Sequence, residues 1–326
     1  MRLVRWLLGL AVVATLAWGG LWFVGARSIE AALAQALATP GTPLTARAQT
    51  VRGFPNRIDV TLTEPALNGG DLRWSAPFLQ VFSLIYRPHH VIVVAANEQA
   101  MSVNGLPVTI TTEDMRASVV MRPTGNLVLD RAVLVARMPV LTLPGERLSA
   151  DTARAAIRLA EGETRRYEAV IEIEAGFPDP AVMAEIDPAG LLPRRWDILR
   201  LDAELMLDRP LDLEVFRGAP MPPATLALTG AQAAFDGIRL DATGRITPDA
   251  RGFPEGELVV SVSNWAALSA RLAEAGMLPP GALSWVQAAA PGLARDDDPE
   301  VLDIPLRLTG GQLRLGPLVL AELPAL

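Results

Sequence analysis

The chain has 326 residues and a formal net charge of −7, with 50% hydrophobic and 20% charged residues. This composition is typical of a folded protein with a sizeable core and excludes an intrinsically disordered chain. The acidic balance argues against nucleic-acid binding, which requires a basic surface. Because the sequence holds no cysteine, disulfide bonds, thiol catalysis and cysteine-ligated metals are excluded.

An uncharged apolar run of about twenty residues, Trp6–Ala26, lies near the start of the chain, after Arg2 and Arg5. A helix of this length crosses the ~30 Å hydrocarbon core of a bilayer, and the arginines favour a cytoplasmic N-terminus. Such a run is either an uncleaved anchor, held in the inner membrane through residues 6–26, or a secretory signal peptide. Val24-Gly25-Ala26 suits a cleavage site, but the length of the run favours the anchor. Both interpretations place the rest of the chain in the periplasm.

The organisation that we predict has three parts. Residues 1–27 form a cytoplasmic tip and the transmembrane anchor (or signal peptide), residues 28–40 a stalk helix, and residues 41–326 a periplasmic antiparallel β-domain. Strong helix formers fill Ser28–Leu37, and Thr39-Pro40-Gly41 ends that helix.

Apolar and polar residues alternate through most of the chain after residue 41. Arg57–Thr63 alternates strictly and places Ile58, Val60 and Leu62 on one face of a strand. Many such strands with few helices between them predict a mainly β fold, a large curved antiparallel sheet that forms an open barrel, a trough or a sandwich. Further strands are expected at Val108–Thr111, Ile171–Glu174, Leu199–Leu205, Leu211–Val215, Ile238–Ala242, Leu258–Val262, Leu306–Leu308 and Leu313–Leu315. The pattern of Asp151–Leu159 fits either a helix or a strand, and a strand is favoured because strands flank it.

Only a few short helices are predicted after the stalk. Asn264 is a candidate N-cap for a helix from Trp265 to Ala275 that Gly276 ends. A second helix is expected over Leu283–Ala290 and a short one around Asp179–Glu185. Turn signals separate the strands, at Asn68-Gly69-Gly70, Asn104-Gly105, Asp236-Gly237 and Gly310-Gly311.

A four-residue motif occurs twice in the chain. Arg52-Gly53-Phe54-Pro55 recurs as Arg251-Gly252-Phe253-Pro254, and Gly176-Phe177-Pro178 is a partial third copy. A turn explains the motif, because Gly supplies an unusual backbone angle and Pro fixes the exit. The alternative is a duplication, in which case residues 41–326 contain two related β-units.

No residue pattern identifies a site of chemistry. Hydrolase elbows and phosphate loops are absent. His89 and His90 are neighbours and point to opposite faces of a strand, so they cannot chelate one ion together. Asp296-Asp297-Asp298 offers oxygen ligands for a hard cation, but a solvated loop is favoured. We therefore assign no catalytic, cofactor-binding or metal-binding residue, and expect no cofactor and no enzymatic activity.

The apolar face of the predicted sheet is the one feature with functional content. If helices cover this face, it is part of the protein core. If the face is open, it can bind acyl chains, because burying each methylene group stabilises the complex by roughly 0.8 kcal/mol. The leading hypothesis is a membrane-anchored periplasmic protein that binds or shields an apolar ligand, lipid above all, in envelope homeostasis. The alternative is a non-catalytic β-scaffold that docks a protein partner in the cell envelope.

Two resemblances support an envelope role. The strand cadence from Leu226 to Trp265 resembles that of AsmA-like envelope proteins, which implies lipid transfer or envelope homeostasis. The chain also has an N-terminal anchor and the motifs Gly53-Phe54-Pro55-Asn56-Arg57, Ile304-Pro305-Leu306, Gly310-Gly311 and Leu315-Gly316-Pro317. In these features the chain as a whole more closely resembles an uncharacterised family of bacterial envelope proteins, a domain of unknown function, which implies a cell-envelope location and no assigned activity. Neither resemblance supplies functional residues.

Overall fold

The structure is a computed structural model that describes residues 2–39, 42–177, 184, 193–216, 224–274, 282–295, 298–316 and 318–323. This part of the chain is mainly β, as predicted, and its antiparallel strands form one sheet of 16 strands and one of 7. The chain divides into two compact units. Unit 1 comprises residues 1–134, 141–144 and 212–220, and unit 2 comprises residues 135–140, 145–211 and 221–326.

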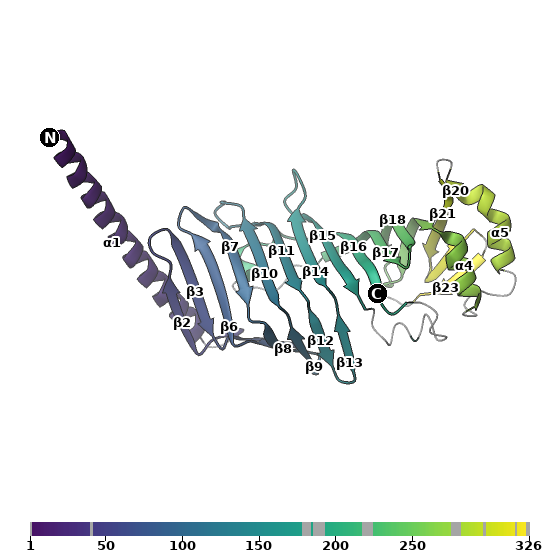
Figure 1. The fold of residues 1–326 in the computed structure, drawn as a ribbon, viewed down its shortest axis with the longest axis horizontal. Coiled ribbons are helices and arrows are strands. Elements are labelled where there is room, and N and C mark those ends of the chain that lie inside the picture. Colours follow the sequence, from purple (N-terminus) through teal and green to yellow (C-terminus); the bar gives the residue numbers. More distant parts are fainter. Residues whose placement is uncertain are drawn as a thin grey trace. The chain divides into compact units, whose positions relative to one another are not determined.

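The elements begin with one long helix and a series of short strands (Figure 1): α1 (Arg2–Ala38), β1 (Leu44–Thr45), β2 (Ala48–Arg52), β3 (Arg57–Thr63), β4 (Ala66–Gly69), β5 (Leu72–Ser75), β6 (Phe78–Leu84), β7 (Arg87–Ala95), β8 (Glu98–Val103), β9 (Leu106–Thr111) and β10 (Asp114–Met121). They continue with β11 (Leu129–Arg137), β12 (Val140–Leu143), β13 (Glu146–Ser149), β14 (Thr152–Leu159), β15 (Arg166–Gly176), β16 (Trp196–Leu207) and α3 (Leu213–Phe216). The last elements are β17 (Ala224–Phe235), β18 (Ile238–Pro248), β19 (Pro254–Ser263), α4 (Trp265–Glu274), α5 (Ala282–Leu293), β20 (Ala294–Arg295), β21 (Asp298–Thr309), β22 (Gln312–Leu315) and β23 (Leu318–Glu322).

In unit 1, successive chain segments cross from one sheet to the other at short breaks. β3 leads into β4 through Glu64, whose φ is +48°, and Pro65, which has no N–H to donate to a ladder. The neighbouring segment breaks at the same level, because the Ala76 amide donates to the Pro65 carbonyl at 3.2 Å and the Glu64 amide to the Pro77 carbonyl at 2.9 Å. The breaks therefore redirect the strands without leaving their backbone groups unpaired.

Unit 2 is built on long antiparallel strands that pair in succession from β14 through β19 to β21. The register shifts within the β16–β17 pair at Asp202 and within the β17–β18 pair between Leu228 and Gly230. Phe235 and Ile238 are fully buried at the turn end of the β17–β18 hairpin, together with Trp196. Ala267 and Leu268 of α4 pack on this cluster, which is one part of the unit's core. Figure 1 shows α4 and α5 beside β21.

Most of the predicted elements are confirmed. All predicted strands but one overlap an observed strand, and the Trp265 and Leu283–Ala290 helices correspond to α4 and α5. The helix-forming residues Ser28–Leu37 are the last part of α1, which continues to Ala38. Asn104 and Gly105 form the β8–β9 turn with φ of +51° and +82°, the geometry that hairpins of this kind require.

One predicted strand is wrong. Leu211–Val215 alternates in sequence, yet α3 begins at Leu213. The carboxylate of Asp212 accepts a hydrogen bond from the Glu214 amide at 3.2 Å, as at the start of a helix, and Pro210 precedes the segment. A local side-chain hydrogen bond here overrides the period of two.

Asn264 precedes α4 as expected, but with a left-handed φ of +54°. The carbonyl oxygen of Asn264 accepts hydrogen bonds from the Ala267 and Leu268 amides, at 3.1 and 3.3 Å. Of the predicted helix around Asp179–Glu185, only Ala184 belongs to the described residues, and it is helical. Ala275 and Gly276 lie outside the described residues.

The repeated motif forms a hairpin connection in both full copies. Arg52-Gly53-Phe54-Pro55 joins β2 to β3, and Arg251-Gly252-Phe253-Pro254 joins β18 to β19. Gly53 and Gly252 have φ of +110° and +86°, where a side chain is strained. A turn role thus accounts for the motif, and the duplication stays a prediction.

Gly256 gives a test of the β18–β19 pairing. Its φ is +153°, and a Cβ atom would lie directly against the Arg245 carbonyl oxygen. We expect Gly256→Ala to lower the free energy of unfolding by about 1–3 kcal/mol, the cost of forcing a strained backbone position. Gly125→Ala is the control, because nothing lies within 4 Å of a Cβ there. Circular dichroism during urea unfolding of the detergent-solubilised chain measures both, and equal stability of the two variants would contradict the expectation.

Candidate functional site

Unit 2 carries two apolar rows that run across its strands. Residues directly opposite each other in antiparallel strands share a face, so each row lies on one side of the sheet. The first row is Ala155, Ile171, Leu201, Ala231, Ala242, Val260 and Ile304. The second, on the same face, is Ala153, Ile173, Leu199, Ala233, Leu240, Val262 and Leu302.

Only part of this apolar face is covered by other elements of the unit. Leu199 and Leu240 of the second row pack against the core cluster that α4 closes. In the first row, by contrast, Ile171 is 52% exposed and Leu201 is 47% exposed. Two large aliphatic side chains, directly opposite each other on β15 and β16, thus face solvent. We call the first row, whose two exposed members are Ile171 and Leu201, the open apolar row.

The reverse face of the same strands is polar. Arg200 donates to Glu172 at 2.9 Å and to Asp202 at 2.8 Å. These hydrogen bonds raise the pKa of Arg200, that to Asp202 most strongly. Further along, Gln232 donates to Asp241 at 2.7 Å. This face of the sheet is therefore charged and hydrogen-bonded, whereas the opposite face is apolar.

The polar face ends in a cluster at β19, β20 and β21. Asp303 accepts hydrogen bonds from Ser261 at 2.6 Å and from Arg295 at 2.8 Å. The bond from Arg295, followed by that from Ser261, lowers the pKa of Asp303 below its usual range. The carboxylate therefore stays charged under all but strongly acidic conditions.

In unit 1, α1 is joined to the β2–β3 turn by tryptophan side chains. The indole N–H of Trp18 donates to the Pro55 carbonyl at 2.8 Å, and that of Trp22 to the Arg57 carbonyl at 2.9 Å. The Phe54 ring meets Trp22 edge to face, with ring centroids 5.5 Å apart. The apolar segment of α1 and the repeated motif are thus in direct contact. Sequence reasoning noted both features but missed the contact between them.

A groove of about 220 Å³ lies beside this contact. Its walls are almost wholly apolar, and they come from α1, from the start of β3 and from Ile85, which directly follows β6. The lining residues are Trp18, Leu21, Trp22, Gly25, Ala26, Ile58 and Ile85.

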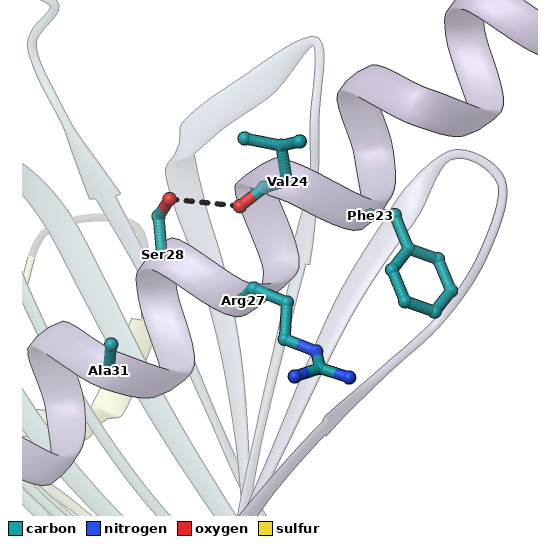
Figure 2. A pocket seen from close by; sticks show the side chains of 5 residues that line it. All are labelled: Phe23, Val24, Arg27, Ser28 and Ala31. Atoms are coloured by element: carbon teal, nitrogen blue, oxygen red, sulfur yellow. Dashed lines mark hydrogen bonds between the residues drawn. The ribbon is translucent and has the colours of Figure 1, made fainter.

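A different side of α1 carries the first charge after the apolar run. Figure 2 shows Phe23 and Arg27 on this side, in a shallow hollow of about 440 Å³ that they line with Val24, Ser28 and Ala31. The Arg27 guanidinium lies 5.9 Å from the centre of the Phe23 ring. An arginine and an aromatic ring at one end of an apolar helix are typical of a membrane–water interface.

The residues considered for chemistry do not gather into a site. His90 hydrogen-bonds across the β7–β10 pair to Ser118 at 3.0 Å, and His89 is its neighbour on β7. Asp298 opens β21 rather than a loop, while Asp296 and Asp297 lie outside the described residues. Over the part of the chain that the structure describes, no group of three metal-ligating side chains is brought together.

The fold and these surfaces define a class: an antiparallel β-sheet protein with an apolar N-terminal helix of membrane-spanning length. A family model described as "Uncharacterized protein conserved in bacteria (DUF2125)" matches residues 22–324, and the chain belongs to this family. No curated protein matches the chain. The AsmA-like resemblance and the envelope location therefore stay predictions.

The Asp303 cluster predicts a pH dependence. Because its pKa is lowered in the folded state, Asp303 stabilises the fold above the unfolded-state pKa of about 3.9, and this contribution is lost as the pH falls through the folded-state value. When the pH is lowered from about 5 to about 2, we expect the melting temperature of Asp303→Asn to fall less than that of the wild type. The fall for Ser261→Ala should lie between those of Asp303→Asn and the wild type. Thermal melts of the detergent-solubilised chain measure this, and equal acid losses in all three would contradict it.

Proposed function

We propose that the protein is a single-pass inner-membrane protein whose periplasmic β-sheet binds or shields lipid acyl chains. The observation that carries the proposal is the open apolar row, in which Ile171 and Leu201 face solvent on a sheet whose reverse side is charged. An exposed apolar patch rimmed by polar groups marks an interaction surface.

The energetics favour a long apolar ligand. Covering apolar surface is worth about 25 cal/mol per Å², or roughly 0.8 kcal/mol per methylene. The open row crosses six strand pairs in register, so a chain that lies along it gains contacts at each step. The row supplies no charged group, which favours hydrocarbon over a polar ligand. Lipid in envelope homeostasis fits these requirements best.

The contact between α1 and the β2–β3 turn supports an uncleaved anchor over a signal peptide. Cleavage after Ala26 would remove both Trp18 and Trp22, and with them the N–H donors to the turn carbonyls. It would also remove the edge-to-face contact between Trp22 and the Phe54 ring. A leader that is discarded has no need of such contacts.

If α1 is a retained anchor, two measurements on the chain in its native membrane have definite expected outcomes. Intact-mass analysis should give a chain that retains residues 18–26. With Gly19→Cys and Phe54→Cys, a short bifunctional thiol reagent should link the helix to the turn, since a Cβ at Gly19 would lie 3.6 Å from the Phe54 ring. Gly9→Cys with Phe54→Cys is the control, because Gly9 lies about 15 Å further along the helix. The absence of native cysteine makes the link unambiguous. A mature chain that begins after Ala26 would refute the anchor.

Lipid binding on the open row predicts site-specific capture. A photoreactive amino acid at Leu201 of the full chain in native membranes should form lipid adducts. The control is Val259, which is 41% exposed but lies on the reverse face. Leu201→Asp should reduce the adducts formed from a probe at Ile171 by about tenfold or more, because a carboxylate is costly to bury against hydrocarbon. Mass spectrometry of the adducts gives the result. Protein adducts in place of lipid would instead favour the alternative, a scaffold that docks an envelope protein.

A further inference from the structure

We propose that two turns of unit 1 form a membrane-contact surface in the periplasmic headgroup layer of the bilayer that α1 crosses. They are the β2–β3 turn (residues 53–56) and the β6–β7 turn (residues 85–86), and the ligands are anionic phospholipid headgroups. In one respect this rests on the proposed function, since α1 must be a retained transmembrane anchor. Lipid binding by the open apolar row is not required.

The two turns lie side by side, at the end of the sheet next to α1. The Ile85 amide donates a hydrogen bond to the Asn56 carbonyl at 3.2 Å, and Ile85 also lines the groove against α1. Trp18 and Trp22 hold the β2–β3 turn on the helix. Figure 1 shows the N-terminal part of α1 extending past this end of β2 and β3. Both turns therefore lie where the apolar helix leaves the sheet.

Polar groups determine the depth of this surface in the bilayer. Arg57, directly after the β2–β3 turn, forms an ion pair with Asp59. Because an ion pair is costly to place in hydrocarbon, the acyl region must end at about the level of Trp18. Trp18 and Trp22 lie about 6 Å apart along the helix, which matches the roughly 5–8 Å that the headgroup layer occupies on each side of a bilayer. The turn that these tryptophans bind therefore lies in the headgroup layer.

The part of α1 before Trp18 reaches the cytoplasmic side. From Arg2 to Trp18 the helix rises about 24 Å. The hydrocarbon core is about 30 Å thick, and a span a few ångströms shorter is accommodated by arginine side chains that extend outward and by local thinning of the bilayer. At the other end, Arg27 lies about 8 Å beyond Trp22, so its long side chain also reaches the headgroups.

The side chains of the membrane-contact surface suit a membrane–water interface. Phe54 is 56% exposed and Tyr86 is 63% exposed, one on each turn. Exposed aromatic side chains beside a membrane helix are typical of such an interface. Arg52 and Arg87, both exposed, flank the turns, which contain no acidic residue. In a chain of net charge −7, this local positive charge favours anionic headgroups.

The first test measures depth, with the full chain in vesicles of phosphatidylcholine and phosphatidylglycerol. Because the chain holds no cysteine, Tyr86→Cys carries a single fluorophore on the β6–β7 turn. Phosphatidylcholine that is spin-labelled close to the headgroup should quench this fluorophore at least about threefold more than phosphatidylcholine labelled near the chain end, which lies about 10 Å deeper.

Phe78→Cys is the matched control for depth. Phe78 is also aromatic and 37% exposed, but it begins β6, the strand that ends at the β6–β7 turn. It therefore lies about 20 Å from the turn along the strand, and neither lipid should quench a fluorophore there. No quenching at position 86, or stronger quenching by the deep label, overturns the membrane-contact surface.

The second test measures the lipid class. Phosphatidylglycerol with the shallow label should quench the fluorophore at position 86 more than phosphatidylcholine with the same label. Arg52→Gln should reduce this preference by up to about fivefold, the factor that corresponds to about 1 kcal/mol for one arginine at an anionic surface. Arg73→Gln, an exposed arginine on β5, is the control and should keep the preference. Equal quenching by both lipid classes overturns the assignment of anionic headgroups.

These outcomes are distinguishable from a failure of the proposed function. A chain that retains residues 18–26 but shows no quenching at position 86 refutes the membrane-contact surface and leaves the anchor standing. Lipid adducts at Leu201 report the open apolar row separately. A mature chain that begins after Ala26 refutes the anchor itself.

Discussion

An antiparallel strand with period-two alternation always produces one apolar face, and that face must be covered by something. In this protein the helices of unit 2 cover only part of it: α4 closes the cluster around Phe235 and Ile238, while Ile171 and Leu201 stay half-exposed. Hydrogen bonding fixes the register, so these side chains cannot rotate away without breaking the ladder. The exposed apolar surface is thus a direct result of the strand pairing. In the proposed function, lipid acyl chains cover this surface.

The charged reverse face makes this arrangement stable in water. Arg200 with its two carboxylate partners, and Asp303 with Ser261 and Arg295, satisfy one another across strands. A half-exposed ion pair contributes little to stability by itself. Its larger effect is to define which face is wet, because a sheet with two apolar faces would aggregate.

The junction of α1 with the β2–β3 turn ties the apolar helix to the sheet. Gly53 permits the turn, Phe54 and Pro55 reach the helix, and the tryptophans of α1 complete the contact. The repeated motif gains a specific meaning in its first copy, since its Phe and Pro contact a membrane-length helix. The family model begins at Trp22, the residue that both donates to Arg57 and packs on Phe54.

Local rules were enough to predict the class of fold, most strands and the hairpin turns, because alternation and Asn-Gly signals act over a few residues. They failed at Leu211–Val215, where the Asp212 carboxylate starts a short helix. The sequence by itself determined an apolar span, a body of antiparallel strands and the absence of thiol chemistry. Only the tertiary structure decided which apolar row stays open and that Trp18 and Trp22 bind the turn, since both depend on contacts between residues about 30 or more positions apart. Pairings over such distances are set by the packing of whole elements, which no local pattern encodes.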